Sequence, residues 1–275
     1  MNADQYFAAG CGALLLAGAL PYVVHALRRG KELAARIDKV GGSPFLNRQI
    51  VEMGYWSVRP LTQGCVALGL TPNMLTWMSL LLGIGAGVAF AFGWLGLGAL
   101  QAMLSAILDI LDGQVARMTN TGSEAGEVFD ASVDRYTETA CFGGLIFFYR
   151  DHLALQVVAL MALLGAYMVS YATAKAEALQ IEPPKGAMRR HERAAYLITT
   201  TSVSSLAAGL TARFAAQVPA PFVVLGLLAI AVVGNASAIR RLMLTSRAVA
   251  ARSRARTEAA AAPAGAPEPA PQTAK

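Results

Sequence analysis

The sequence contains few charged residues. Asp, Glu, Lys and Arg make up 15% of its 275 residues, whereas soluble domains typically carry about 25%. Several apolar windows of about 20 residues are each long enough to cross the hydrocarbon core of a bilayer. The scarcity of charge excludes an ordinary soluble domain and predicts an all-α, polytopic membrane protein.

Cysteine and histidine are also scarce, with three residues of each. Cys11, Cys65 and Cys141 lie far apart in apolar stretches, and no CxxC motif or Cys/His ligand spacing occurs. This pattern favours neither a disulfide framework nor a zinc site. Any metal that the protein binds is therefore expected to have oxygen ligands.

Apolar segments and basic residues together predict a topology. The predicted spans are 6–27, 72–94, 96–116, 129–149, 153–174, 194–213 and 221–239. Of the 23 lysines and arginines, 19 fall in segments 28–60, 175–193 and 240–275. Alternation from span to span places these segments on one side, which the positive-inside rule makes cytoplasmic. The sequence thus predicts seven spans.

The chain divides into four predicted regions. Residues 1–30 are expected to be a retained transmembrane anchor with its amino terminus outside, because the leading MNADQYF has no positive charge and Arg28, Arg29 and Lys31 follow the span. Residues 31–70 are expected to be a cytoplasmic juxtamembrane segment, either lying in the membrane interface or packed on protein as a connector. Residues 71–246 contain the other six spans, and the Ala/Pro-rich tail 247–275 is expected to be disordered.

Four aspartates interrupt the apolar pattern within DILDGQVARMTNTGSEAGEVFDASVD. Asp109 and Asp112 are three residues apart and Asp130 and Asp134 are four apart, so each pair shares one helix face. An aspartate at a span centre costs about 2.5–3.5 kcal/mol on insertion scales. Because the linker is short, the two helices are expected to be antiparallel neighbours whose carboxylates converge near the cytoplasmic side. Two divalent cations would hold such a cluster, as in phosphoryl-transfer sites.

The residues after the first aspartate pair indicate a phosphate-containing substrate. Gly113 and Ala116 leave one helix surface bare, so a ligand can approach it closely. Arg117 offers a planar fork of donors that suits a phosphate group. Metal ligands, a small docking surface and an arginine together predict a site for a diphosphate.

The whole pattern, DxxDGxxAR, eight residues and then GxxxDxxxD from Asp109 to Asp134, resembles the signature of the CDP-alcohol phosphotransferases (CDP-alcohol phosphatidyltransferases). The resemblance extends from about residue 45 to 243 and includes LGLTPNMLT (68–76), but not the first span or the tail. It implies a six-span core with one extra amino-terminal span, a homodimer and two Mg²⁺ or Mn²⁺ ions. It also implies a bacterial inner (plasma) membrane enzyme of phospholipid synthesis, with its site facing the cytoplasm and no nucleic-acid partner.

The resemblance also implies roles for individual residues. Asp109, Asp112 and Asp130 would bind the metals, and Asp134 would complete the metal site and act as the general base. The CDP moiety would be held by Gly113, Ala116 and Arg117. The implied reaction is transfer of a phosphatidyl group from CDP-diacylglycerol to an alcohol, with release of CMP.

The identity of the alcohol depends on weaker similarities. FDASVDRYTE (129–138), RRHER (189–193) and RRLM (240–243) resemble elements of the phosphatidylinositol-phosphate synthases. The implied pocket for an acceptor phosphate contains Arg135, Arg190, Arg193 and Arg241. However, TAKAEA (173–178) departs from their KARAEA, so Thr173 stands where they have a lysine and Lys175 is the candidate to replace it. Inositol phosphate is the first expectation, and glycerol 3-phosphate or another alcohol stays open, since the positive-inside bias alone also explains these arginines.

Other functions also fit parts of the pattern. A membrane prenyltransferase uses aspartate pairs to hold Mg²⁺ and a diphosphate, but its two motifs normally lie far apart and the GxxAR element is left unexplained. An ion transporter could carry intramembrane carboxylates, although transport sites tend to lie near the midplane. An inactive scaffold is the third alternative, which the intact motif disfavours.

Overall fold

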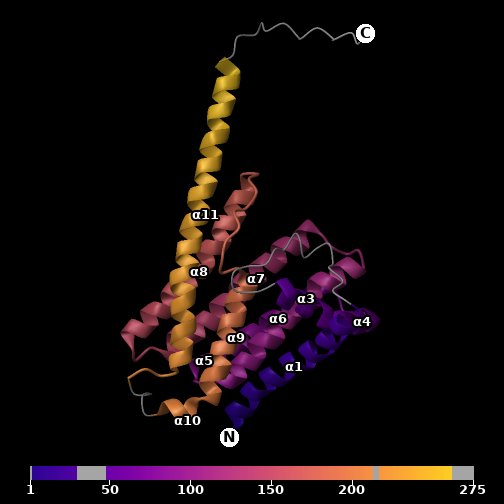
Figure 1. Cartoon of the computed structure of the whole chain (residues 1–275), viewed down its shortest axis with the longest axis vertical. Helices are drawn as coiled ribbons and strands as arrows, with labels where there is room; N and C mark the ends of the chain where they lie inside the picture. The colour runs from indigo at the N-terminus through magenta and orange to yellow at the C-terminus, as the bar shows by residue number, and fades with distance from the viewer. Residues whose placement is uncertain (1, 30–47, 213–216, 262–275) are drawn as a thin grey trace.

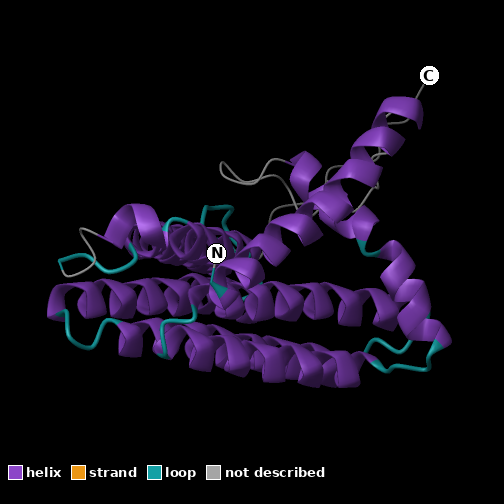
Figure 2. Cartoon of the chain, turned by 90° about the horizontal axis from the view of Figure 1, so that it is seen from below, coloured by secondary structure: helices purple, strands orange, loops and turns teal. Residues whose placement is uncertain are grey.

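The computed structural model describes residues 2–29, 48–212 and 217–261, and this part of the chain is helical without strands (Figures 1 and 2). The helices are α1 (Ala3–Arg29), α3 (Arg48–Ser57), α4 (Arg59–Ala67), α5 (Pro72–Ala91), α6 (Leu95–Met118), α7 (Glu124–Phe148), α8 (Leu153–Ala178), α9 (Arg190–Leu206), α10 (Ala208–Thr211) and α11 (Pro221–Ala261). The expected all-α polytopic bundle is confirmed.

Six of the predicted spans each coincide with one helix, and the described part of span 194–213 is divided between α9 and α10, but the number of spans stays a prediction. Among the described residues α1, α5, α6, α8 and α11 are long and apolar enough to cross a membrane. The other two candidates are more polar or shorter. Helix α7 contains two of the four aspartates together with Arg135 and Glu138, and α9 has 17 residues and many hydroxyl side chains.

Helix α5 packs against both helices that carry the aspartates, α6 and α7. Thr71 caps its amino terminus by accepting a hydrogen bond from the Met74 amide at 3.3 Å, and Pro72 occupies the first turn. Further along, α5 and α7 touch backbone to backbone, because a Cβ atom on Gly144 would lie 2.0 Å from the Gly87 carbonyl oxygen. Glycine is therefore required where these two helices cross.

The expectation that α6 and α7 are antiparallel neighbours is wrong. Helix α5 packs against both of them, whereas α6 and α7 do not pack along their lengths. Ser123 caps α7 by accepting a hydrogen bond from the Gly126 amide at 3.1 Å, so α7 begins close after the end of α6. The aspartates can still meet because they lie near this connection, and the space that a direct helix contact would fill remains available for a site.

Helix α11 continues well past its predicted end and differs from the expectation of a disordered tail. It runs to Ala261 and extends beyond the rest of the bundle (Figure 1, yellow). Alanine and arginine are among the strongest helix formers, so an Ala/Arg-rich sequence can continue a helix without a core. Arg252 donates a hydrogen bond to the carbonyl of Leu179 at 2.9 Å, which ties the extension to the end of α8. Residues 262–275 of the predicted tail lie outside the described residues.

The juxtamembrane region packs against the bundle where it is described. Val58 and Thr62 are buried, and Val58 belongs to an apolar cluster with Leu75 and Leu111. The Thr62 hydroxyl also donates to the Gln114 side chain at 2.8 Å. Helix α4 is therefore packed on protein, and the choice between an interfacial and a connector segment stays a prediction. Residues 30–47 of the predicted segment lie outside the described residues.

Candidate metal and diphosphate site

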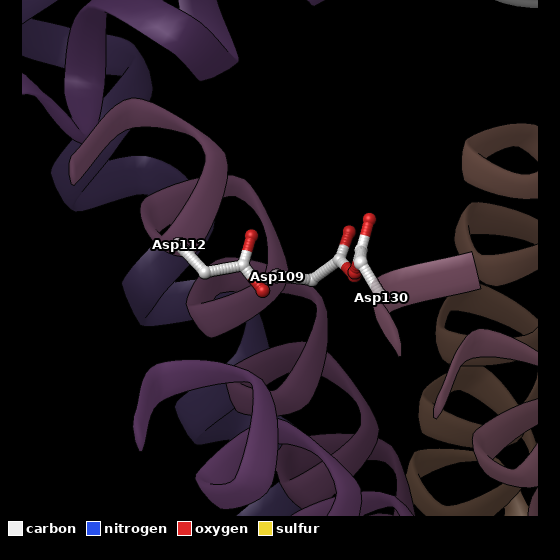
Figure 3. Close-up of side chains that lie close together, drawn as sticks. All are labelled: Asp109, Asp112 and Asp130. Atoms are coloured by element: carbon white, nitrogen blue, oxygen red, sulfur yellow. The ribbon is translucent and has the colours of Figure 1, made fainter. Parts of the chain in front are cut away.

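Three of the four aspartates converge on one point. Asp109 and Asp112 on α6 and Asp130 on α7 each offer a carboxylate oxygen, and these oxygens lie within 4.8 Å of one another (Figure 3). Asp112 is only 4% exposed, and one oxygen of Asp130 is buried without a hydrogen-bond partner. A buried oxygen without a partner and three carboxylates at this spacing fit a hard divalent cation.

Asp112 is held in place by a residue for which the sequence suggested no role. The Thr76 hydroxyl on α5 donates a hydrogen bond to Asp112 at 2.7 Å, and Thr76 itself is 4% exposed. A ligand whose second oxygen is fixed in this way presents a defined orientation to a metal. Thr76 lies in the quoted stretch LGLTPNMLT, but only the packing of α5 against α6 reveals its contact.

The fourth aspartate joins the cluster through Arg190 at the beginning of α9. The Arg190 guanidinium donates two hydrogen bonds to Asp109, at 2.8 and 2.7 Å, and lies 2.5 Å from Asp134. Arg190 therefore balances part of the negative charge where α6, α7 and α9 meet. A guanidinium fork binds carboxylate and phosphate with the same geometry, so this arginine could serve either partner.

Arg193 and Arg135 share a buried carboxylate that the sequence analysis missed. Glu138 accepts hydrogen bonds from Arg193, which is 1% exposed, and pairs with Arg135 at 2.6 Å. Arg193 also donates to the Met188 carbonyl at 2.6 Å. Glu138 continues the four-residue spacing of Asp130 and Asp134 along α7, which is the signal that could have identified it.

The start of α9 is fixed by a second buried carboxylate. Glu192 is fully buried and accepts hydrogen bonds from the amides of Met188, at 2.6 Å, and Arg189, at 3.3 Å. These bonds satisfy two backbone amides at the amino terminus of α9 that have no partner within the helix. They set the position of Arg190 and Arg193 relative to α6 and α7.

The remaining candidate acceptor residues lie in two different environments. Arg241 on α11 is 5% exposed and donates to the Thr173 hydroxyl and to the Gly186 carbonyl, each at 3.0 Å. Thr173, at the position where the resembled synthases have a lysine, thus faces α11. Lys175 is exposed, on a different side of α8 from Thr173.

The predicted CDP-binding residues lie on the outer turn of α6. A Cβ atom on Gly113 would lie 3.1 Å from a terminal nitrogen of Arg117, so the arginine side chain extends back over the glycine. Ala116 is half-buried and Arg117 is exposed. The small-residue surface formed by Gly113 and Ala116 therefore lies next to the Arg117 guanidinium, as the sequence predicts.

A cavity of about 420 Å³ lies beside the acidic cluster and Arg190. Residues of α6, α7 and α9 line it, including Asp109, Glu138 and Arg190. It occupies the space between helices that α5 keeps apart, and its volume is in the range of small-molecule sites, about 300–1,000 Å³.

Comparison with known proteins agrees with this geometry. Residues 69–245 match the sequence profile described as CDP-alcohol phosphatidyltransferase. Phosphatidylinositol phosphate synthase of Mycobacterium marinum is 35% identical over 167 residues, which cover 59% of this chain and 70% of that protein. The Mycobacterium tuberculosis protein of that name is 32% identical over 165 residues, covering 58% of this chain and 75% of its own length.

Crystal structures of the Mycobacterium tuberculosis synthase are similar in fold and sequence. The form in complex with manganese and citrate has a TM-score of 0.59 and 28% identity, covering 68% of this chain and 87% of that one. The form with CDP-DAG bound has the same TM-score and identity and covers 68% and 92%.

Proposed function

Because the chain belongs to the CDP-alcohol phosphatidyltransferase family, we propose that it transfers a phosphatidyl group from CDP-diacylglycerol to inositol phosphate and releases CMP. The observation that carries this proposal is the convergence of Asp109, Asp112 and Asp130 beside an arginine-lined cavity. The chain is thus an enzyme of phospholipid synthesis and an integral membrane protein. Family membership also decides against the prenyltransferase and transporter interpretations.

The acidic cluster is suited to a divalent metal, and we propose two ions, Mg²⁺ or Mn²⁺. Asp109, Asp112 and Asp130 would hold them, with Asp134 completing the site. When bound, such ions neutralise charge on the diphosphate as the transition state forms. The manganese in the Mycobacterium tuberculosis structure supports the choice of metal type.

Asp134 is the proposed general base. In the reaction the acceptor hydroxyl loses its proton to Asp134, its oxygen bonds to the lipid-side phosphorus, and the bond from that phosphorus to CMP breaks. The Arg190 guanidinium pairs with the Asp134 carboxylate at 2.5 Å and balances its negative charge. It also fixes the direction in which the carboxylate points.

Gly113, Ala116 and Arg117 are proposed to bind the CDP moiety. A side chain at Gly113 would press against Arg117, so glycine leaves the arginine free to lie along α6. The exposed position of Arg117 suits a ligand group that enters from the aqueous side.

The acceptor phosphate is proposed to bind at the arginines around Asp134. Arg190 and Arg135 lie 2.5 and 4.0 Å from the Asp134 carboxylate, so both can reach a phosphate placed next to the base. Arg193 supports them through Glu138. Arg241 and Lys175 are included as outer contacts, on the sequence resemblance.

Assembly and orientation are further parts of the proposal. The family resemblance supports a homodimer, and the distribution of basic residues supports a catalytic site that opens to the cytoplasm of a bacterial inner (plasma) membrane. The bacterial source of the similar synthases agrees with this location.

The test is CMP release by the purified chain in detergent with CDP-diacylglycerol and Mn²⁺ or Mg²⁺. Inositol phosphate, inositol, glycerol 3-phosphate and serine are supplied one at a time, with Asp134→Asn as the inactive control. Rapid CMP release with inositol phosphate alone supports the proposal. Activity with glycerol 3-phosphate instead would follow from Thr173 in the place of the synthases' lysine, and would overturn the choice of acceptor while leaving the reaction intact.

A further inference from the structure

The cavity is lined by both charged and apolar side chains. Asp109 and Arg190 contribute charged groups to this lining and belong to the proposed catalytic site. Leu15 of α1 also contributes to the lining, together with Tyr55 of α3. Much of the lining between these groups is carbon, including Met103, Ala106, Ile110, Phe142 and Ile198. One continuous cavity thus joins the reacting centre to the extra amino-terminal helix.

Helix α1 is docked at defined points along its length. At its beginning, Asp4 accepts hydrogen bonds from the Gly96 and Leu97 amides, each at 3.0 Å, and from the Ser205 hydroxyl at 2.6 Å. One turn before Leu15, Cys11 is 2% exposed in a cluster with residues of α6. Beyond Leu15, the Ser57 hydroxyl donates to the Gly18 carbonyl at 2.9 Å. Leu15 is therefore held in a fixed place.

The rest of α1 has the character of a lipid-facing helix. Leu16 and Leu20 are 60% and 61% exposed, Leu15 is 54% exposed although it also lines the cavity, and the span as a whole is strongly apolar. Helix α1 also lies outside residues 69–245, the region that matches the family. This chain therefore adds, to the family's core, a helix that touches both the surrounding hydrocarbon and the cavity.

The chemical structure of CDP-diacylglycerol indicates which group would fill the apolar part of the cavity. In CDP-diacylglycerol the diphosphate is covalently joined to two hydrocarbon chains, so a diphosphate at Asp109 brings those chains to within reach of the adjoining apolar surface. Burying them there is favourable because each methylene removed from water contributes about 0.8 kcal/mol. A nucleotide or an inositol ring has no such chain and would leave the apolar part of the cavity unfilled.

Resting on the proposed function, we propose that the cavity holds one acyl chain of CDP-diacylglycerol and that Leu15 of α1 forms the wall that limits its length. A long chain would reach Leu15, whereas a short chain would end before it. Helix α1 is then a determinant of lipid selectivity that the matched family region does not contain.

The experiment compares donors of different chain length on variants of the full chain. CMP release is measured in one nanodisc composition with dioctanoyl and dipalmitoyl CDP-diacylglycerol and a fixed acceptor. Leu15→Trp should lower kcat/KM for the dipalmitoyl donor about tenfold or more, because hydrophobic pockets discriminate by this amount for small changes in size. It should leave the dioctanoyl rate near that of the wild type, which also shows that the variant folds.

Leu16→Trp is the matched control, because it places the same bulk one residue away on a side chain that does not line the cavity. It should leave both donors near wild-type rates. Leu15→Ala should shift preference toward donors longer than dipalmitoyl.

The outcomes separate this inference from the proposed function. No CMP from the wild type with either donor would overturn the proposed function. An active wild type with Leu15→Trp equal to Leu16→Trp, or with Leu15→Trp equally impaired on both donors, would overturn the acyl-chain role of α1 alone. If Leu15→Trp equals Leu16→Trp, the acyl chains lie in the bilayer. If Leu15→Trp is equally impaired on both donors, Leu15 contributes only to helix packing.

Discussion

At the scale of single residues, the metal ligands are supported by side chains of other helices. Thr76→Val removes the hydroxyl that donates to Asp112 and keeps the volume of the side chain. We expect the metal concentration needed for half-maximal CMP release to rise about tenfold, since loss of such supporting contacts typically costs 10- to 100-fold in metal affinity or activity. The rate at saturating metal should change much less. Titration with Mn²⁺ at fixed substrate provides the measurement.

Thr76→Ser is the control for this prediction, because serine retains a hydroxyl on the same turn. It should titrate close to the wild type. If Thr76→Val also titrated like the wild type, the hydrogen bond to Asp112 would have no part in holding the metal.

Glu138 is expected to matter for stability through Arg193. Glu138→Gln leaves the guanidinium of Arg193, which is 1% exposed, without its charge partner. Breaking a buried ion pair costs about 3–5 kcal/mol, so the variant should melt at a clearly lower temperature in detergent. Thermal unfolding monitored by intrinsic fluorescence would check this. Glu177→Gln, an exposed glutamate on α8, should melt like the wild type; equal melting of both variants would contradict the role of Glu138.

How far the site could be predicted differs between these residues. The four aspartates and Arg117 were predicted from spacing and the family signature, because one stretch of chain contains that pattern, whereas Arg190, Arg193 and Arg241 were predicted from shorter resemblances elsewhere in the chain. Thr76 acts on Asp112 across 36 positions of sequence, and only helix packing brings the two together. Glu138 was open to prediction from the register of α7, but its pairing with Arg193 again depends on where α9 begins.

At the scale of helices, hydropathy located the spans but not their neighbours. The apolar runs fix where α5, α6 and α8 begin and end within a few residues, because a bilayer demands a certain length. The separation of α6 and α7 by α5 depends on the Gly87–Gly144 crossing, which a periodic pattern does not reveal. The helical extension of α11 was missed because low hydrophobicity was taken to mean disorder, although alanine and arginine favour helix.

Among the helix contacts, the strength with which α1 is held against the bundle can be tested most directly. Asp4→Ala removes the acceptor of three hydrogen bonds from α6 and α9. Hydrogen bonds to charged groups contribute about 1.5–3 kcal/mol each, so α1 should separate from α6 at least about tenfold more often. Cys11, which lies on the side of α1 that packs against α6 and is 2% exposed, should then react correspondingly faster with a maleimide.

Mass spectrometry can compare Cys11 with Cys65 of α4, which belongs to a different apolar cluster from Cys11 and serves as an internal reference. Asp151→Ala changes an exposed aspartate in a loop and should leave the Cys11 rate as it is. An unchanged Cys11 rate in Asp4→Ala would show that apolar packing alone holds α1.

At the scale of the whole molecule, the shape of the bundle and the distribution of charge lead to the same orientation. The beginning of α1 and the end of α11 lie at opposite ends of the structure (Figure 1), as an odd number of membrane crossings requires. Helix α11 has 41 residues and is therefore about 60 Å long, roughly twice the thickness of a hydrocarbon core. Its second half, which contains Arg247, Arg252, Arg254 and Arg256, must extend into water on the carboxyl-terminal side.

By the positive-inside rule we expect that side to be cytoplasmic, so a tag on the amino terminus should face the outside of a bacterial inner membrane and a tag on the carboxyl terminus should face the inside. In spheroplasts, added protease should remove the amino-terminal tag, while the carboxyl-terminal tag should survive until the membrane is lysed. Seven crossings require this opposite behaviour, because α7 and α9 must both span despite their polar residues. Protection of both tags, or loss of both, would mean an even number of crossings, and one of these two polar helices would then lie outside the membrane.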